Sequence, residues 1–212
     1  MEAYLRQQDL INQDYGQYIL QGIDYNQYKI NMLEELHSNP DDTIRAYIKL
    51  NQSRMHRVEN TYTLSEDITN QLKGLRHKRY WLVITEHWCG DAAQNLPVFN
   101  AVAEASNGKI EMKLVYRDQN PELMNAYLTN GTRSIPKIIQ LDRHFNTTGI
   151  WGPRPGAAQK LVNDLKSNPE TAPGYANQLH LWYAKDKHKS LEVEVGNLLG
   201  RANKFFSDSQ LN

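Results

Sequence analysis

The chain has 212 residues, of which 40% are hydrophobic and 23% are charged, and its 24 basic and 24 acidic residues cancel when the histidines are neutral. This length suits one large domain, or a core of roughly 100 residues with helical additions. The balanced charge and the lack of long runs of like charge give no indication of a nucleic-acid partner.

The N-terminal residues MEAYLRQQDL lack the basic start and apolar run of a secretory signal, and no stretch is apolar enough to cross a bilayer. We therefore expect a cytoplasmic protein with no membrane partner. The single cysteine, Cys89, excludes an internal disulfide and the cysteine-based zinc sites. The seven histidines lack metal-ligand spacing, and neither a phosphate loop nor a dinucleotide fingerprint is present, so we expect no metal and no cofactor.

Residues 1–75 have a helical pattern without a clear strand. Apolar residues within 24–38 recur at steps of three and four until Asn39-Pro40, a second helix follows a capping Asp41 or Asp42, and a third begins after Ser65. We expect the apolar stripes to be core. They consist of Tyr25, Tyr28, Met32, Leu33 and Leu36 in the first helix and of Ile44, Tyr47, Ile48, Met55 and Val58 in the second.

The character of the sequence changes at Tyr80. Residues 80–85, YWLVIT, form the short apolar run that is typical of a strand covered on both faces, and the basic residues just before it, Lys73, Arg76, Lys78 and Arg79, indicate a solvated surface. The pattern then predicts a β-α-β-α-β-β-α order, hence an α/β fold with a mixed sheet and helices on both faces. The expected elements are helices at 91–105, 121–129, 156–167 and 175–199, and strands at 110–116, 137–141 and 146–151.

The stretch Trp88-Cys89-Gly90-Asp91-Ala92, between a strand and a helix, resembles the active-site turn of the thioredoxin family, whose usual form is Trp-Cys-Gly-Pro-Cys. Ser134-Ile135-Pro136 resembles the segment that carries a cis-proline beside the cysteine, and Pro97 and Gly152 fall at positions where the family has proline and glycine. The resemblance covers residues 78–168. It implies a thioredoxin-like fold with helical extensions at 1–77 and 169–212.

A cysteine at the start of a helix faces unpaired backbone N–H groups and the positive end of the helix dipole, which both favour the thiolate. The resemblance makes Cys89 the candidate catalytic residue. It also implies that a cis Ile135-Pro136 bond presents backbone to an extended substrate, with Trp88 and Gly90 completing the substrate-binding surface.

Three residues depart from the family pattern. Ala92 replaces the second cysteine, so the dithiol cycle is excluded, and Val83 replaces a buried acid that assists proton transfer in many thioredoxins. Asp91 places a carboxylate beside the sulfur, which should raise the pKa of Cys89. His87 could oppose that effect if protonated, although an exposed polar role is the favoured interpretation, and Glu86 and Asp91 are better explained as helix caps than as an acid–base pair.

These residues support two main hypotheses. One is a monothiol thiol-disulfide oxidoreductase in which Cys89 forms a mixed disulfide that an external thiol resolves, so that its partners are protein or small-molecule thiols and disulfides. The other is a non-catalytic thioredoxin-fold module that binds a peptide or partner protein. A thiol sensor, or a cluster shared with a second subunit, is a weaker alternative.

The layout of the whole chain is similar to an uncharacterised bacterial branch of thioredoxin-like proteins. Its helical extensions could cover the sheet, narrow access to Cys89 or form a homodimer surface.

Overall fold

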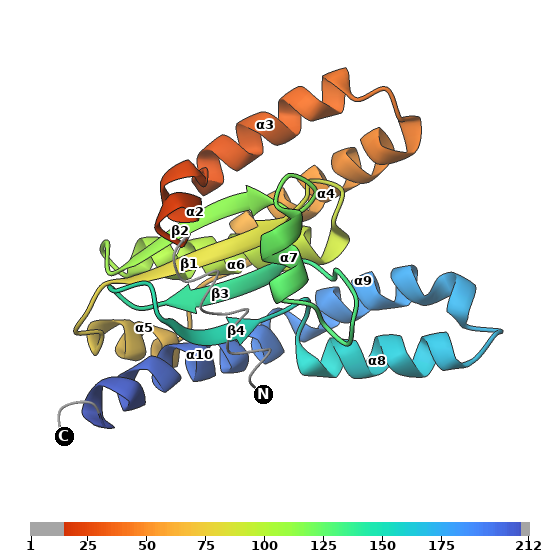
Figure 1. Cartoon of the computed structure of the whole chain (residues 1–212). Helices are drawn as coiled ribbons and strands as arrows, with labels where there is room; N and C mark the ends of the chain where they lie inside the picture. Colours follow the sequence, from red (N-terminus) through yellow and green to blue (C-terminus); the bar gives the residue numbers. More distant parts are fainter. Residues whose placement is uncertain (1–14, 209–212) are drawn as a thin grey trace.

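The computed structural model describes residues 15–208, and its side chains through residue 200 (Figure 1). The helical pattern expected for residues 1–14 lies outside this range. The helices before the sheet are α2 (Tyr15–Gln21), α3 (Tyr25–Ser38), α4 (Asp42–Thr61) and α5 (Glu66–Lys73). The central region contains β1 (Arg79–Thr85), α6 (Gly90–Ala105), β2 (Ile110–Tyr116), α7 (Pro121–Ala126), β3 (Lys137–Leu141), β4 (Thr147–Trp151) and α8 (Gly156–Ser167). A short 3-10 turn (Ala172–Gly174), α9 (Tyr175–Asp186) and α10 (Lys189–Asp208) follow.

The four strands form a mixed sheet in the order β2-β1-β3-β4. The β1 and β2 strands pair in parallel, whereas β3 is antiparallel to both β1 and β4. The β1 strand lies inside the sheet, between β2 and β3, and its residues Trp81 to Ile84 are fully buried. This burial on both faces explains why the sequence of β1 is continuously apolar. The α/β fold class and the mixed sheet expected from the sequence are therefore confirmed.

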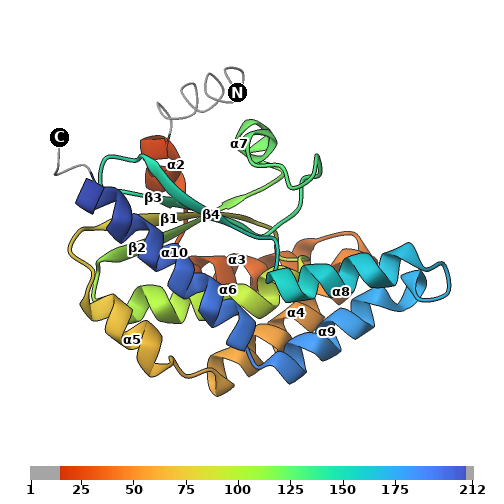
Figure 2. The same cartoon turned by 90° about the horizontal axis from the view of Figure 1, so that it is seen from below.

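Helices cover both faces of the sheet. In Figure 2, α2 and α7 lie on one side of the sheet, and α6 and α10 lie on the other, with α4 outside α6. The α8–α9 pair extends beyond the sheet at the end where α6 begins (Figure 1). This arrangement places C-terminal helices next to the start of α6, where Cys89 lies.

Side-chain caps begin the N-terminal helices as their sequences indicate. The carboxylate of Asp41 accepts hydrogen bonds from the N–H groups of Thr43 and Ile44 at the start of α4, and the hydroxyl of Ser65 accepts one from Ile68 at the start of α5. These caps satisfy backbone donors that have no partner within the helix.

Two residues of the expected apolar stripes are exposed. Leu33 is 49% exposed and Tyr47 is 51% exposed, whereas their neighbours Met32 and Ile48 are buried. One residue corresponds to about 100° of rotation around a helix, so a side chain beside the buried stripe can point away from the core. The expectation that both residues belong to the core was wrong.

Two expected helices have different ends. The expected helix 121–129 stops at Ala126 because Tyr127 leaves the helical conformation at φ −124° and ψ 37°. The expected helix 175–199 is interrupted by Lys187 and His188, which adopt positive φ angles of 50° and 65°. Neither break involves glycine or proline, the residues that usually signal one in a sequence.

Arg79 does not belong to a solvated basic surface. It is 1% exposed at the start of β1, and its Nη1 donates a 2.8 Å hydrogen bond to the carbonyl of Leu199 in α10. Burial lowers the pKa of the Arg79 guanidinium to about 10. The sequence before β1 gave no sign of this contact, because α10 lies 120 residues further along the chain.

Candidate functional site around Cys89

Cys89 is the N-cap residue of α6, directly after the loop that follows β1. Its sulfur accepts a hydrogen bond from the N–H of Ala92 at 3.4 Å, and its own N–H donates to the carbonyl of Glu86 at 3.1 Å. The sulfur therefore takes the place that a serine or aspartate oxygen occupies in an ordinary helix cap. This is the position expected from the sequence.

The segment before β3 lies against the sulfur. The thiol of Cys89 donates to the carbonyl oxygen of Ile135 at 3.3 Å, and the Ile135-Pro136 peptide bond is cis. Gly152, the residue directly after β4, lies against this segment. A Cβ atom at Gly152, which has a φ of 119°, would lie 2.1 Å from the Pro136 carbonyl oxygen, so the close approach requires glycine.

Asp91 is held by residues from the C-terminal half of the chain. Its carboxylate accepts hydrogen bonds from Arg154, with Nη2 at 2.5 Å and Nε at 3.0 Å, and from the hydroxyl of Tyr183 in α9 at 2.7 Å. The amide of Asn95 donates to the same Tyr183 hydroxyl at 2.9 Å. Asp91 thus joins α6 to α9 and to the loop after β4, beyond the capping role suggested by its sequence position.

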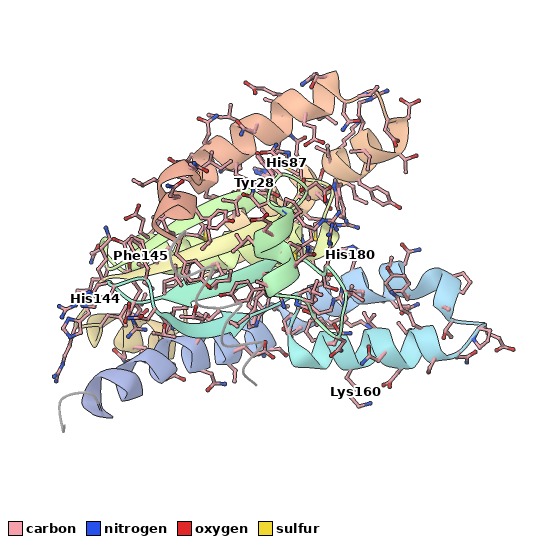
Figure 3. All side chains as sticks on the ribbon, viewed as in Figure 1. Tyr28, His87, His144, Phe145, Lys160 and His180 are labelled. Carbon is pink, nitrogen blue, oxygen red and sulfur yellow. The ribbon has the colours of Figure 1, made fainter. Side chains whose placement is uncertain are left out.

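The helix α9 also covers Gly90. A Cβ atom at Gly90 would lie 2.9 Å from the imidazole of His180 and 3.3 Å from Nη1 of Arg54. The Nδ1 atom of His180 lies 3.2 Å from the amide nitrogen of Gln94 in α6, and Figure 3 shows His180 where α9 meets the central part of the molecule. Gly90 therefore serves as the contact surface for α9.

These surroundings keep the Cys89 thiol protonated. The residue is 6% exposed, and burial, followed by the negative charge of Asp91, raises its pKa to about 12. The N–H groups of Ala92 and Asp91 and the charge of Arg154 lower the pKa, but their effect is smaller. The N–H groups at the helix start favour the thiolate and the charge of Asp91 opposes it, as the sequence predicts, but burial outweighs the effect of the helix start.

His87 is buried rather than exposed. It is 2% exposed, and its Nδ1 lies 2.6 Å from a carboxylate oxygen of Glu35, while its Nε2 lies 3.1 Å from the carbonyl of Tyr28. Burial lowers the pKa of His87, although the hydrogen bond and charge of Glu35 act in the opposite direction. Figure 3 shows His87 beside Tyr28 of α3. His87 therefore connects the turn around Cys89 to the N-terminal helices.

The other residues near the turn form a polar edge. Trp88 is half-buried, and the guanidinium of Arg117 lies 4.8 Å from the centre of its ring. Glu86 is buried and accepts a 2.9 Å hydrogen bond from the N–H of Asp118. Burial raises the pKa of Glu86 to about 7. Because the Glu86 carboxylate accepts from Asp118 and the N-cap of α6 is Cys89, Glu86 is not a cap of this helix.

Sequence reasoning missed the residues that cover the site, namely Arg154, His180 and Tyr183. The hydrogen bonds of Arg154 and Tyr183 to Asp91 join residues 63 and 92 positions apart. No local pattern reports such contacts. A buried carboxylate needs a cationic or hydrogen-bonding partner, but the sequence did not show that Asp91 is buried.

The mixed sheet, the cysteine that caps the helix after β1 and the Ile135 carbonyl against its sulfur together define a thioredoxin-like protein. The chain matches the family model described as Thioredoxin over residues 37–166, and it therefore belongs to the thioredoxin family. Within the described residues, no helix is both long and apolar enough to span a membrane.

Known proteins resemble this chain in part or in fold. Over 52 residues it is 36% identical to Thioredoxin 1 of Nostoc sp. (strain PCC 7120 / SAG 25.82 / UTEX 2576), a match that covers 24% of this chain and 46% of that relative. The chain thus spans about half the length of this curated relative. A solved protein of unknown function from Pseudomonas aeruginosa has a TM-score of 0.58 and 21% identity, covering 90% of this chain and 97% of the other. An HIV epitope scaffold has a TM-score of 0.54 and 19% identity, covering 90% and 98%. These two structures share the fold.

Proposed function

We propose that this chain is a monothiol thiol–disulfide exchange protein that reacts through Cys89 and depends on an external thiol. The observation that carries the proposal is the position of the sulfur, which caps α6 and lies 3.3 Å from the carbonyl oxygen of Ile135. An extended substrate that reaches this point would meet the sulfur and the Ile135-Pro136 backbone together. Trp88 and Gly90 border the same turn.

The reaction requires two exchanges. The Cys89 thiol loses its proton to solvent, the thiolate attacks one sulfur of a substrate disulfide, and the substrate's other sulfur leaves as a thiolate. Because Ala92 stands where the second cysteine would be, a thiolate from another molecule then attacks the mixed disulfide and releases Cys89. The substrate sulfur is then bonded to the external thiol, and a second external thiolate cleaves that bond, so two external thiols are oxidised for each substrate disulfide that is reduced. Cys89 returns to its starting state.

The closed arrangement must open for this chemistry. With a pKa of about 12, only about one Cys89 in 100,000 is a thiolate at pH 7. Movement of α9 away from Gly90 would return water to the sulfur and reduce the burial that raises the pKa. In this proposal residues 78–168 form the exchanging domain, and the extensions 1–77 and 169–212 cover it.

A second candidate is a non-catalytic module that binds a peptide or partner protein. The low exposure and raised pKa of Cys89 favour this alternative, because both suppress attack by the thiol. In that case the surface bordered by Trp88 and Pro136 would recognise a partner without forming a covalent bond. Serine at position 89 would then leave partner binding intact.

The two candidates can be separated with purified protein and a small disulfide. The protein is incubated with hydroxyethyl disulfide and excess glutathione, and mixed disulfides are followed by intact mass after acid quenching. We expect an adduct on Cys89 that forms and is cleared, with loss of disulfide above the uncatalysed rate. Cys89→Ser removes the chain's single thiol and serves as the matched control. If the natural protein forms no adduct and matches the Cys89→Ser rate, the exchange function is wrong.

A further inference from the structure

A cavity of about 490 Å³ lies between the end of α4, the end of α9 and the start of α10, and it shares Tyr183 with the surroundings of Cys89. In Figure 2 the end of α4 and the junction of α9 and α10 lie next to each other at the bottom of the view. The residues that line the cavity include Arg57, Tyr62, Tyr183, Lys187, His188 and Glu192. This volume is within the range of pockets that hold small metabolites.

His188 lines this cavity and carries a buried polar atom that has no hydrogen-bond partner within the described residues. The residue is 8% exposed, and among the described residues its Nδ1 atom has no hydrogen-bond partner. Its ring packs edge-on against Tyr62, with 5.7 Å between ring centres. A buried polar atom without a partner is costly in a folded protein, so a ligand atom that satisfies Nδ1 would be favoured.

The charges at the cavity favour an anion. Arg57 and Lys187 contribute positive charge, and the ammonium of Lys187 has no ion-pair partner within the part of the chain that the structure describes. The one acidic lining residue, Glu192, already accepts hydrogen bonds through Oε1 from the Tyr62 hydroxyl at 2.7 Å and the Ser65 N–H at 3.1 Å. Arg57 already donates one hydrogen bond, to the side-chain oxygen of Gln94 at 2.9 Å, so the Lys187 ammonium and the net positive charge are what favour an anionic ligand.

We propose that this cavity binds a small molecule through an anionic oxygen group, a phosphate or a carboxylate, which His188, Lys187 and Arg57 contact. The Nδ1–H of His188 donates to the anion, and the two cations offset its charge. Cys89 is not among the residues that line this cavity, and anion binding does not require thiol exchange. Both phosphate and carboxylate present oxygen acceptors of the kind that these donors fit, and the experiment distinguishes them.

The test is a titration of the full chain, labelled with ¹⁵N, with inorganic phosphate and separately with citrate, at an ionic strength held constant by chloride. We expect at least one of these anions to give saturable shifts at His188 and at neighbouring residues of α4 and α10. The probe that binds more tightly identifies the anionic group. No saturable shift with either anion, or equal shifts with chloride alone, would overturn the proposal without bearing on Cys89.

Variants then assign the binding to these residues. His188→Asn removes the imidazole but keeps a residue that tolerates positive φ, and we expect it to weaken binding at least tenfold. Lys187→Asn, chosen for the same reason, should also weaken binding, while Lys185→Gln, an exposed charge outside the lining, should leave it unchanged. Far-ultraviolet circular dichroism checks that each variant is folded. Binding by a folded His188→Asn variant with the affinity of the natural chain would refute the assignment.

Discussion

Replacing Asp91 with asparagine should lower the pKa of Cys89 and speed its reaction with alkylating reagents. The Asp91 carboxylate is the second cause, after burial, of the rise in the Cys89 pKa to about 12, and Arg154 acts in the opposite direction. Asparagine removes the negative charge and leaves the positive charge of Arg154 nearby. Both changes favour the thiolate.

The expected size follows from the relation between pKa and thiolate population. If the pKa of Cys89 falls by about one, the thiolate fraction rises about tenfold at any pH well below the pKa, which corresponds to about 1.4 kcal/mol. The rate of alkylation by iodoacetamide between pH 7 and pH 9 should rise by the same factor. Because the chain has one cysteine, the increase in intact mass reports Cys89 alone.

The substitution also weakens the fold. The side chains of Asp91 and Arg154 are 8% and 16% exposed, and removing one partner of a buried ion pair typically costs about 3–5 kcal/mol. Asparagine keeps an oxygen that can accept hydrogen bonds from Arg154 and Tyr183, so we expect the free energy of unfolding to fall by about 3 kcal/mol. Urea unfolding would measure it.

Two controls separate charge from loosening. Tyr183→Phe removes the hydrogen bond from α9 but keeps the Asp91 charge, and Asp164→Asn makes the same substitution at an exposed ion pair with Lys160. If Tyr183→Phe accelerates alkylation as much as Asp91→Asn, the charge of Asp91 is not the cause. An unchanged or slower rate in Asp91→Asn would refute the electrostatic reasoning.

Three further predictions follow from the same contacts. Burial raises the pKa of Glu86 from 4.5 to about 7, so the folded state favours the protonated carboxyl, and the free energy of unfolding should fall by on the order of 3 kcal/mol as the pH rises from 4.5 to 7. Urea unfolding at several pH values should show a flatter pH dependence for Glu86→Gln, and an equal slope in both proteins would contradict the prediction. Gly152→Ala should destabilise the fold by about 3 kcal/mol or more, because its Cβ would meet the Pro136 carbonyl oxygen at 2.1 Å and its φ is positive; thermal melting within a degree of the natural chain would refute this. Gly90→Ala should push His180 from the turn and raise the alkylation rate of Cys89, and an unchanged rate would show that α9 does not control access.

Much of the fold could be predicted from local patterns. The apolar run of β1, the Asp41 and Ser65 caps and the turn around Cys89 each depend on neighbouring residues, and the structure places them accordingly. The mixed sheet also follows from the predicted β-α-β-α-β-β-α order of elements, whereas the strand order comes from the structure. Local propensity and tertiary packing agree in these segments.

The environment of Cys89 could not be predicted in the same way. The sequence shows Asp91 beside the sulfur, but not that Arg154 and Tyr183 enclose it, because those contacts cross more than 60 residues. His87 likewise looks like a surface residue until Glu35 of α3 is placed against it. The electrostatic balance at the sulfur depends on burial, which is a property of the assembled helices.

The central claim is that Cys89 exchanges disulfides with partners through a mixed disulfide. The most direct test is mass spectrometry of the protein isolated from cells under acid quench, with alkylation of free thiols. We predict that a fraction of the chains carries a thiol-linked adduct on Cys89, which a reductant removes. If every chain carries an unmodified Cys89, even after cells are exposed to a disulfide oxidant, the exchange mechanism is contradicted.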